Sequence, residues 1–276
     1  MSGYTKSSLF SKMLRISADK RLHGQGGDRS TNFVVDLGAN LQRCKRLSIQ
    51  SVTFPNNFYN VFNNSYNGQH NNIGYIDHPG LPSTFTIAPG FYNTTQLMSA
   101  IVTAFNTVAT GHATITAFTQ DPLSQLCTFT FNSDSTATLI RFDKDNDGNS
   151  QASPWTLLGF SGSVSTTVAP VTKTATSLPS MSGLTEAYIM SNTLAPSNAF
   201  DEKGQLSNVL IGIPITASFG QLNVFDCKVD VLCEVLYPRS RDIGLCDFML
   251  VDRNGKEVNL NGGNVKLDLR VWFDHY

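Results

Sequence analysis

Charge is scarce in this chain of 276 residues, because Asp, Glu, Lys and Arg together make up only 15% of it. Typical globular domains contain about 25%. The net charge is −1 and the isoelectric point lies near 6.5, which excludes a generally basic nucleic-acid-binding protein. No apolar run approaches the roughly 18 residues that a transmembrane helix needs. We expect a chain whose surface is hidden in an assembly or covered by Ser, Thr and Asn.

Cysteine is also scarce, and its spacing matches no known framework. The odd number of cysteines and the lack of a pair two to four residues apart argue against a disulfide scaffold and a zinc site. The N-terminus contains no apolar stretch typical of a secretory signal. We therefore expect a reducing compartment and five small buried hydrophobic side chains: Cys44, Cys127, Cys227, Cys233 and Cys246.

Catalytic signatures are missing. The chain contains no HExxH motif, no GxSxG elbow and no P-loop. The pairs Asp77-His78 and Asp274-His275 are adjacent in sequence, and neighbouring side chains of a strand point to opposite faces. We predict no enzymatic activity, no catalytic residue, no cofactor and no metal ligand. The remaining histidines, His23, His70 and His112, stand alone.

One acidic segment partly matches a calcium loop. Asp143–Gly148 has the D-x-D-x-D-G pattern, but Pro154 stands where the closing bidentate Glu belongs. Three carboxylates at alternate positions can still wrap a hard cation in a β-loop. The simpler interpretation is an exposed acidic turn, and we expect that one.

A second segment, residues 56–75, combines many Asn residues with aromatic ones. Aromatic stacking and amide hydrogen bonds are the means by which proteins bind sugars. Asn side chains also satisfy backbone groups in turns. The segment is therefore either a carbohydrate-binding loop or a packed loop cluster at a subunit contact.

The ends of the chain differ in charge. Residues 1–29 hold six Lys or Arg against two Asp, a net charge of +4, while the rest holds 14 basic and 19 acidic residues. The segment HGQGGDRS at 23–30 has the composition of a flexible linker. We predict that residues 1–29 form a flexible basic arm that contacts a neighbouring subunit or packaged nucleic acid. An ordinary disordered terminus is the alternative.

Most of the chain beyond residue 30 alternates with a period of two, which predicts strands. The last strand is the clearest, because Val265, Leu267, Leu269, Val271 and Phe273 share one face. Residues 161–182 show no period and are expected to form a surface connection. An Asn254-Gly255 type I′ turn is expected to join a hairpin over 247–260. Further strands are expected at 32–37, 46–54, 113–118, 127–131, 137–142, 184–190, 209–215, 220–225 and 229–237.

Only residues 94–108 are convincingly helical, with Asn93 and Gln96 as a capping pair. The strand count predicts an all-β fold: a single jelly-roll sandwich with an inserted small α+β lobe. Residues 30–58 and 183–276 would form the jelly-roll domain. Residues 59–182 would form the insertion lobe.

Several short motifs, in order, resemble the penton and minor capsid proteins of virophages, polinton-like viruses and giant-virus relatives. Near the N-terminus the matching residues are Ser17, Arg21, Asn32-Phe33, Leu37, Leu47, Ser51-Val52, Pro55-Asn56 and Tyr59-Asn60. Further matches are Gly90–Thr94 with Leu97, then Leu158-Gly159-Phe160, then the segment Asp252–Gly262. Together they span nearly the whole chain.

The resemblance implies a virion structural protein, a single jelly-roll penton subunit that forms homo-pentamers at the fivefold vertices of an icosahedral capsid. It implies assembly in the host cytoplasm beside capsomers of the major capsid protein, and it carries over no catalytic residue. Contacts with DNA or minor capsid proteins through the arm are expected. Two alternatives stay open: a minor capsid protein at another position, and a virion receptor- or glycan-binding module on a jelly-roll scaffold.

Overall fold

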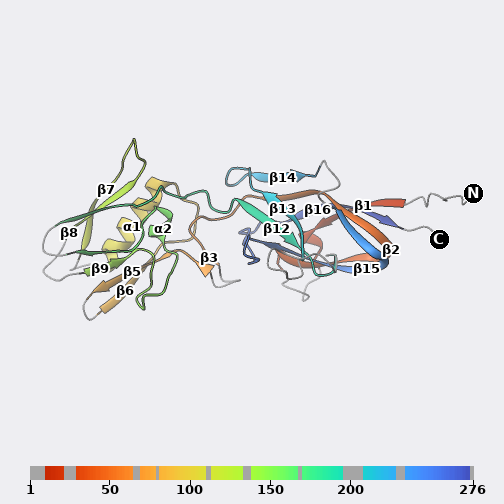
Figure 1. Ribbon diagram of the computed structural model, residues 1–276, viewed down its shortest axis with the longest axis horizontal. Helices are drawn as coiled ribbons and strands as arrows, with labels where there is room; N and C mark the ends of the chain where they lie inside the picture. The colour runs from red at the N-terminus through yellow and green to blue at the C-terminus, as the bar shows by residue number, and fades with distance from the viewer. Residues whose placement is uncertain are drawn as a thin grey trace, which may run out of the picture. The chain divides into compact units, whose positions relative to one another are not determined.

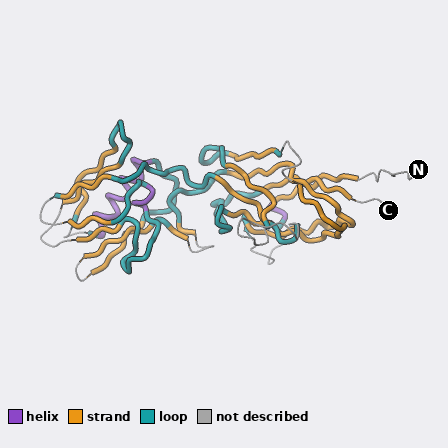
Figure 2. The backbone as a smooth tube through the Cα atoms, in the orientation of Figure 1, coloured by secondary structure: helices purple, strands orange, loops and turns teal. Residues whose placement is uncertain are grey.

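The computed structural model is dominated by strands (Figures 1 and 2). Two compact units make up the chain: Met1–Phe58 together with Leu184–Tyr276, and Tyr59–Gly183. No described helix is long and apolar enough to cross a membrane. The residues that the structure describes are 10–21, 29–64, 69–78, 81–109, 113–132, 138–166, 170–194, 208–227 and 234–273.

One half of the first unit is a sheet of antiparallel strands. Its order is β1 (Phe10–Ser17), β16 (Lys266–Phe273) and then the second half of β2 (Asn32–Pro55). The edge beyond β2 is shared by β14 (Leu222–Asp226) and the start of β15 (Glu234–Val251). In this half, β16 is an interior strand.

The other half uses the opposite ends of the two long strands. The start of β2 pairs with the end of β15, which pairs with β12 (Glu186–Met190), and β12 pairs with β13 (Val209–Pro214). Between the halves the register of β2 with β15 shifts three times, and Arg43 adopts a φ of 58°. These irregularities bend both strands, so that each contributes to both halves.

In chain order the strand segments of the first unit form a jelly roll. If they are lettered B to I from β1 to β16, one half has the order B-I-D-G and the other C-H-E-F. The expected all-β, jelly-roll class is confirmed. The second unit enters between the end of β2 and the start of β12.

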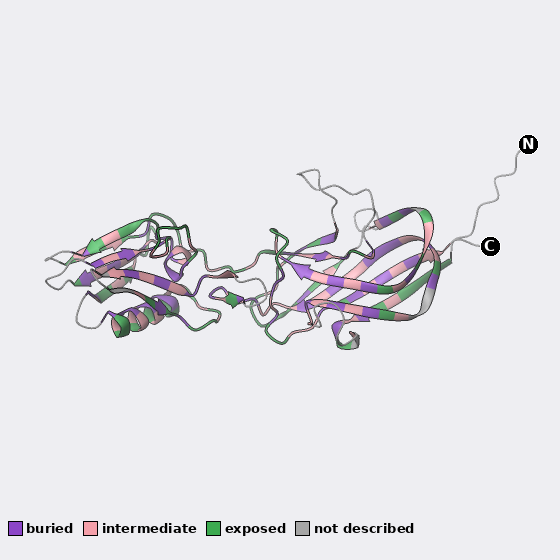
Figure 3. Cartoon of the chain, turned by 90° about the horizontal axis from the view of Figure 1, so that it is seen from below, coloured by how far each residue is buried: buried purple, intermediate pink, exposed green. Residues whose placement is uncertain are grey.

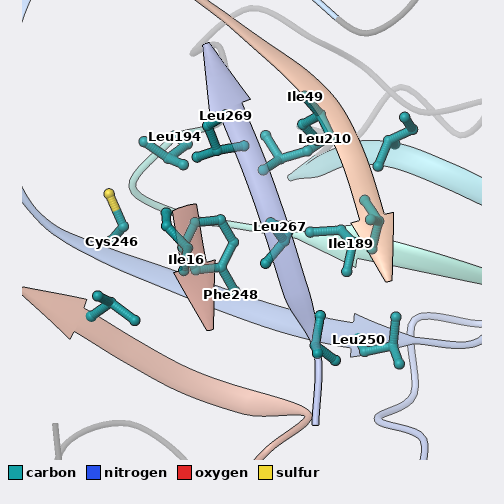
Figure 4. Packing of buried hydrophobic residues seen from close by; sticks show 14 of the residues in the cluster. Ile16, Ile49, Ile189, Leu194, Leu210, Cys246, Phe248, Leu250, Leu267 and Leu269 are labelled. Atoms are coloured by element: carbon teal, nitrogen blue, oxygen red, sulfur yellow. The ribbon is translucent and has the colours of Figure 1, made fainter. Parts of the chain in front are cut away.

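The core of the first unit lies between these two halves. Val265, Leu267, Leu269 and Val271 are at most 1% exposed, and Phe273 packs partly buried against the same cluster. Buried and exposed residues therefore alternate along the strands (Figure 3). Figure 4 shows Leu267 and Leu269 among apolar side chains from β1, β2, β12 and β15. This alternation is typical of a sandwich in which each sheet has one face in the core and one face exposed to solvent.

The second unit contains two sheets and a helix. One sheet has the order β10-β9-β5-β6 and the other β11-β8-β7, and β3 pairs only with β4. The strands are β3 (Asn63–Asn64), β4 (Gln69–His70), β5 (Ile73–His78), β6 (Leu81–Thr86), β7 (Thr114–Gln120), β8 (Cys127–Asn132), β9 (Thr138–Arg141), β10 (Ser163–Thr166) and β11 (Val171–Thr174).

Helix α1 (Thr94–Val108) begins with the predicted cap. Asn93 Oδ1 accepts from the Gln96 backbone N at 2.8 Å, and Gln96 Oε1 accepts from the Asn93 N at 3.0 Å. Two orphan donors of the first turn are thereby satisfied. The helix buries Leu97, Met98, Ile101 and Phe105 against an aromatic core. At its centre lies Trp155 of α2 (Pro154–Leu157), 5.2 Å from the rings of both Phe129 and Phe142.

The predicted flexible arm is wrong for residues 10–20. β1 pairs with β16 over eight residues, from Phe10 opposite Phe273 to Ser17 opposite Lys266, and the short helix η1 (Ala18–Lys20) follows it. Ile16 is the one buried side chain of β1, so the edge strand carries little hydrophobic signal. Residues 1–9 and 22–28 lie outside the described residues.

The expected surface connection 161–182 contains β10 and β11. Both are edge strands of their sheets, and Thr166 is the one fully buried residue in them. Hydrogen bonds between Thr pairs, Thr128 with Thr174 (3.0 Å) and Thr130 with Thr172 (3.4 Å), tie β11 to β8. Polar cross-strand pairs thus replace the hydrophobic alternation that the sequence lacks.

The expected type I′ hairpin is also wrong. Gly255 has a φ of 74°, but Asn254 does not have the positive φ that a type I′ turn requires. Asp252 holds the turn instead, since its Oδ1 accepts from the backbone N of Asn254 (2.8 Å) and of Lys256 (2.9 Å). Beyond the turn, a single bridge joins Glu257 to Val251 in place of the expected strand.

Candidate functional site

The Asn-rich segment uses its amides to hold its own loops. Asn60 Nδ2 donates to the carbonyls of Tyr92 (2.7 Å) and Met181 (3.1 Å), and its Oδ1 accepts from the Tyr92 N (2.9 Å). Asn71 bridges the backbone of Asn60 and Phe62. These amides are buried, so they are not displayed for a sugar.

The aromatic residues of the same segment are also packed. Phe58 is 5% exposed and lies edge-on to Phe54, with 5.9 Å between ring centroids. Tyr59 and Phe62 are half-buried, and Tyr66 lies outside the described residues. The described part of the segment therefore lacks a row of exposed rings on which a sugar could stack.

The acidic loop Asp143–Gly148 closes on itself. The oxygens of Asp145 accept from the backbone N of Asp147 (3.0 Å), the backbone N of Asn149 (2.8 Å) and Asn149 Nδ2 (3.0 Å). The Asn149 side chain and these backbone donors lower the pKa of Asp145. Asp143 Oδ2 accepts from the Gly162 N. Within the described residues, no group of three His, Cys, Asp or Glu is arranged to hold a metal ion.

The other candidate pairs do not come together as ligands. Asp77 forms an ion pair with Arg141 at 2.9 Å, and His70 Nε2 lies 3.2 Å from Gln151 Nε2. His78 ends β5, and nothing is described of its side chain. The remaining candidates, His23, His112, Asp274 and His275, lie outside the described residues.

Three of the cysteines are buried free thiols. Burial raises the pKa of Cys44 and Cys127 to about 11 and that of Cys246 to about 12, so all three stay protonated and unreactive near neutral pH. Cys227, in contrast, is disulfide-bonded, which corrects our expectation. It is the first residue after β14. Cys233 lies outside the described residues.

A basic and aromatic cluster lies on the outer face of the β1–β16–β2 half. Arg46 stands opposite Trp272 and Leu236 in the strand registers. The guanidinium carbon of Arg46 lies 4.0 Å from the centroid of the Trp272 ring, and that of Arg270 lies 5.7 Å away. Arg46 also forms an ion pair with Glu234. These contacts fix three long side chains in place on the surface.

Apolar side chains are exposed around this cluster. Met13 is 52% exposed and Leu236 61%. Leu222 and Val224 of β14 are likewise exposed, and they share the outer face with Thr53 and Pro55 of β2. We call this surface, formed by the outward residues of β1, β16, the second half of β2, β14 and the start of β15, the basic face.

The opposite half of the sandwich has an outer face of different character. Asp36 stands opposite Leu245, and Val34 opposite Asp247. Leu245 is 45% exposed, and Glu186 projects from β12 on the same side as Met190. We call this surface, formed by the outward residues of the first half of β2, the end of β15, β12 and β13, the acidic face.

Asp247 of the acidic face is held by the loop that follows β12. Its oxygens accept from the backbone N of Asn192 (2.9 Å) and of Thr193 (2.8 Å), and from the hydroxyls of Thr193 (2.6 Å) and Ser191 (3.1 Å). Burial alone raises the pKa of Asp247, but these donors outweigh it and the pKa is lowered. A carboxylate therefore remains charged here at neutral pH.

Comparison with known proteins gives a likeness to solved structures. No protein-family model matches the chain, and no curated protein matches it. Among solved structures, the crystal structure of the selenomethionine-labelled mavirus penton protein aligns over 96% of this chain and 100% of its own. The identity is 10% and the TM-score is 0.44.

Sequence reasoning missed both outer faces. Arg46 and Trp272 are far apart in sequence, and only the register between β2 and β16 brings them together. Since Leu267, Leu269 and Val271 share the inward side of the last strand, the alternation leaves Arg270 and Trp272 on its outward side. The pattern carried no sign that a basic residue from another strand would join them.

Proposed function

We propose that the chain is a virion structural protein, a jelly-roll penton subunit that assembles into homo-pentamers at the fivefold vertices of an icosahedral capsid. The observation that carries this proposal is the exposure of large apolar side chains on both outer faces of the sandwich, on the strands themselves and not only at loop tips. Contiguous exposed apolar surface marks sites of protein–protein contact.

The residues that resemble the capsid proteins have architectural roles in this chain. Asn56, at the end of β2, donates to the Ala217 carbonyl at 2.6 Å, and Asn60 joins three backbone segments. Gly159 has a φ of 85°, and its carbonyl accepts from the backbone N of Thr176 and Ser177. They form a scaffold of loops, which supports a structural protein over an enzyme.

The alternative of a glycan- or receptor-binding module has less support. It needs aromatic and amide groups turned outward in residues 56–75, whereas most described aromatic and Asn side chains of that segment are buried or half-buried, with Asn63 exposed. Under the proposed function the partners are copies of this chain and capsomers of the major capsid protein. Contacts of the basic N-terminal residues with DNA or minor capsid proteins belong to the same proposal.

Imaging of particles that contain the chain tests the proposal. An icosahedral reconstruction should show five copies of the jelly roll around each fivefold axis. Density for this chain at other positions, beneath or between the capsomers, would contradict the vertex assignment and make it a minor capsid protein. Purified particles in which mass spectrometry detects no copy of the chain would contradict a structural role.

A further inference from the structure

We infer that neighbouring copies of the chain contact each other through unlike surfaces, the basic face of one copy against the acidic face of the next. This inference rests on the proposed function and adds to it which surfaces form the contact between subunits. The partner is a second copy of this chain.

Among the described residues, the basic face carries four cations (Arg15, Arg46, Lys266 and Arg270) and three carboxylates (Asp226, Glu234 and Asp268), so its net charge is positive by one. Two of the cations have no carboxylate partner in the described residues. Arg15 pairs with Asp268 at 3.0 Å and Arg46 with Glu234, whereas Arg270 and Lys266 form no ion pair there. Arg270 leans over Trp272, and its Nε is buried without an acceptor. Arg270 and Lys266 are therefore the cations of this face that a carboxylate of a neighbouring copy would pair with.

The acidic face carries carboxylates and no cation at the outward positions of its described strands. Asp36, Glu186 and Asp247 lie there, and Leu245 and Met249 supply apolar area between and beside them. Asp247 is fixed by Ser191, Asn192 and Thr193, so its charge has a defined position. The two outer faces of one sandwich are therefore complementary to each other in charge and are both partly apolar.

Complementary unlike faces have a geometric consequence. A contact between two acidic faces would bring carboxylates together without a cation, which is repulsive. A contact between two basic faces would leave the carboxylates of the acidic face without a cationic partner. A contact between unlike faces is heterologous, so each copy keeps one free face, and a rotation that closes generates a ring.

Charge reversal tests the inference on the full chain. The basic face is reversed by Lys266→Glu with Arg270→Glu, and the acidic face by Asp36→Lys with Glu186→Lys. Each reversed protein should lose about tenfold or more in ring fraction at a fixed concentration, measured by native mass spectrometry. The protein that carries all four substitutions should regain rings to within about threefold of wild type, because both faces are again unlike.

A matched control separates contact from net charge. Arg253→Glu with Lys256→Glu changes the net charge by the same amount as the reversal of the basic face, at exposed residues of the Asp252 turn. It should leave the ring fraction unchanged. Thermal melting of every variant, with Tm within a few degrees of wild type, shows that the loss of rings is not a loss of folding.

The outcomes distinguish this inference from the proposed function. Wild-type protein that forms rings insensitive to reversal of the acidic face overturns the inference and leaves the proposed function intact. The inference is also overturned if both reversed proteins lose their rings and the protein with all four substitutions does not regain them. In that case the two faces do not contact each other in the ring. Wild-type protein that stays monomeric at every concentration overturns the proposed function itself.

Discussion

The guanidinium of Arg46 lies over the ring of Trp272, 4.0 Å from its centroid, although the two residues come from opposite ends of the jelly-roll sequence. Glu234 forms an ion pair with the same guanidinium. The pair stands on the outer face of the sandwich beside the exposed Leu236. An ordered basic and aromatic surface loses little entropy when a neighbour binds it, and such residues dominate binding energy at interfaces.

Replacement of Trp272 should separate assembly from folding. Trp272→Ala removes a partly exposed ring and its cation–π contact, so the free energy of unfolding should fall by about 0.5–1 kcal/mol, while the ring fraction should fall by about tenfold. Trp272→Phe keeps an aromatic face and should restore most of the assembly. A Trp272→Ala protein that assembles like wild type would contradict the account of this face.

Leu269 should tolerate no charge, because it is 1% exposed in the centre of the core (Figure 4). Leu269→Asp buries an unpaired carboxylate and should lower the free energy of unfolding by more than about 4 kcal/mol. Lys266→Asp, an outward residue of the same strand, should change it by no more than about 0.5 kcal/mol. Urea denaturation of the two variants measures the difference, and equal midpoints would refute the assignment of the inward face.

The fold should require glycine at position 159, because the backbone there has a positive φ and because no room is left for a Cβ atom. Its φ is 85°, and an added Cβ would lie 2.0 Å from the Ser177 carbonyl oxygen. Gly159→Ala should therefore cost at least about 2 kcal/mol, through strain and through movement of the backbone. Gly162 also has a positive φ, of 74°, but open space around it, so Gly162→Ala should cost about 1 kcal/mol. Similar Tm values for both variants would contradict the close approach.

The lowered pKa of Asp247 predicts an acid-sensitive contribution to stability. The pKa of an unfolded Asp is about 3.9, and that of folded Asp247 is lower. Its contribution is therefore fully present above pH 3.9 and is lost as the pH falls through the folded pKa. Asp247→Asn should lower Tm at pH 7 more than at pH 2–3. A pH-independent effect of Asp247→Asn would count against the hydrogen-bonded carboxylate.

Calcium should not stabilise the protein. Asp145 already uses both carboxylate oxygens to hold Asp147 and Asn149, and the sequence offers no closing bidentate Glu. Tm should be the same in millimolar calcium and in a chelator, as mass action requires for a protein without a site. A calcium-dependent rise that Asp145→Asn abolishes would show that the loop is a structural metal site.

The sequence predicted elements whose signal is local. The alternation of Leu267, Leu269 and Val271 gave β16 its inward face, and the Asn93–Gln96 pair marked the start of α1. The sequence did not predict the strands β1 and β10, because an edge strand buries few side chains. Ile16 is the one buried side chain of β1, and Thr166 is the one buried side chain of β10. Their partners, β16 and β9, supply the hydrogen bonds that hold them, and no local pattern reports such pairing.

The basic face and the acidic face could not be predicted from the sequence for a related reason. Outward positions are free of packing constraints, so Arg46 and Asp36 look like ordinary surface charges in the sequence. The bends of β2 and β15 decide which half of the sandwich each residue joins. Arg43, with a φ of 58°, marks that bend, and a positive φ at Arg is not foreseeable from residue type.

The mass of the purified full chain in solution tests the central claim most directly. A subunit of 30.1 kDa should form a discrete species of five copies, about 150 kDa, in native mass spectrometry at micromolar concentration, and its images should show fivefold rings. A chain that remains at the mass of one copy, or that forms a closed dimer through two like faces, would contradict a penton built from unlike faces of a jelly roll.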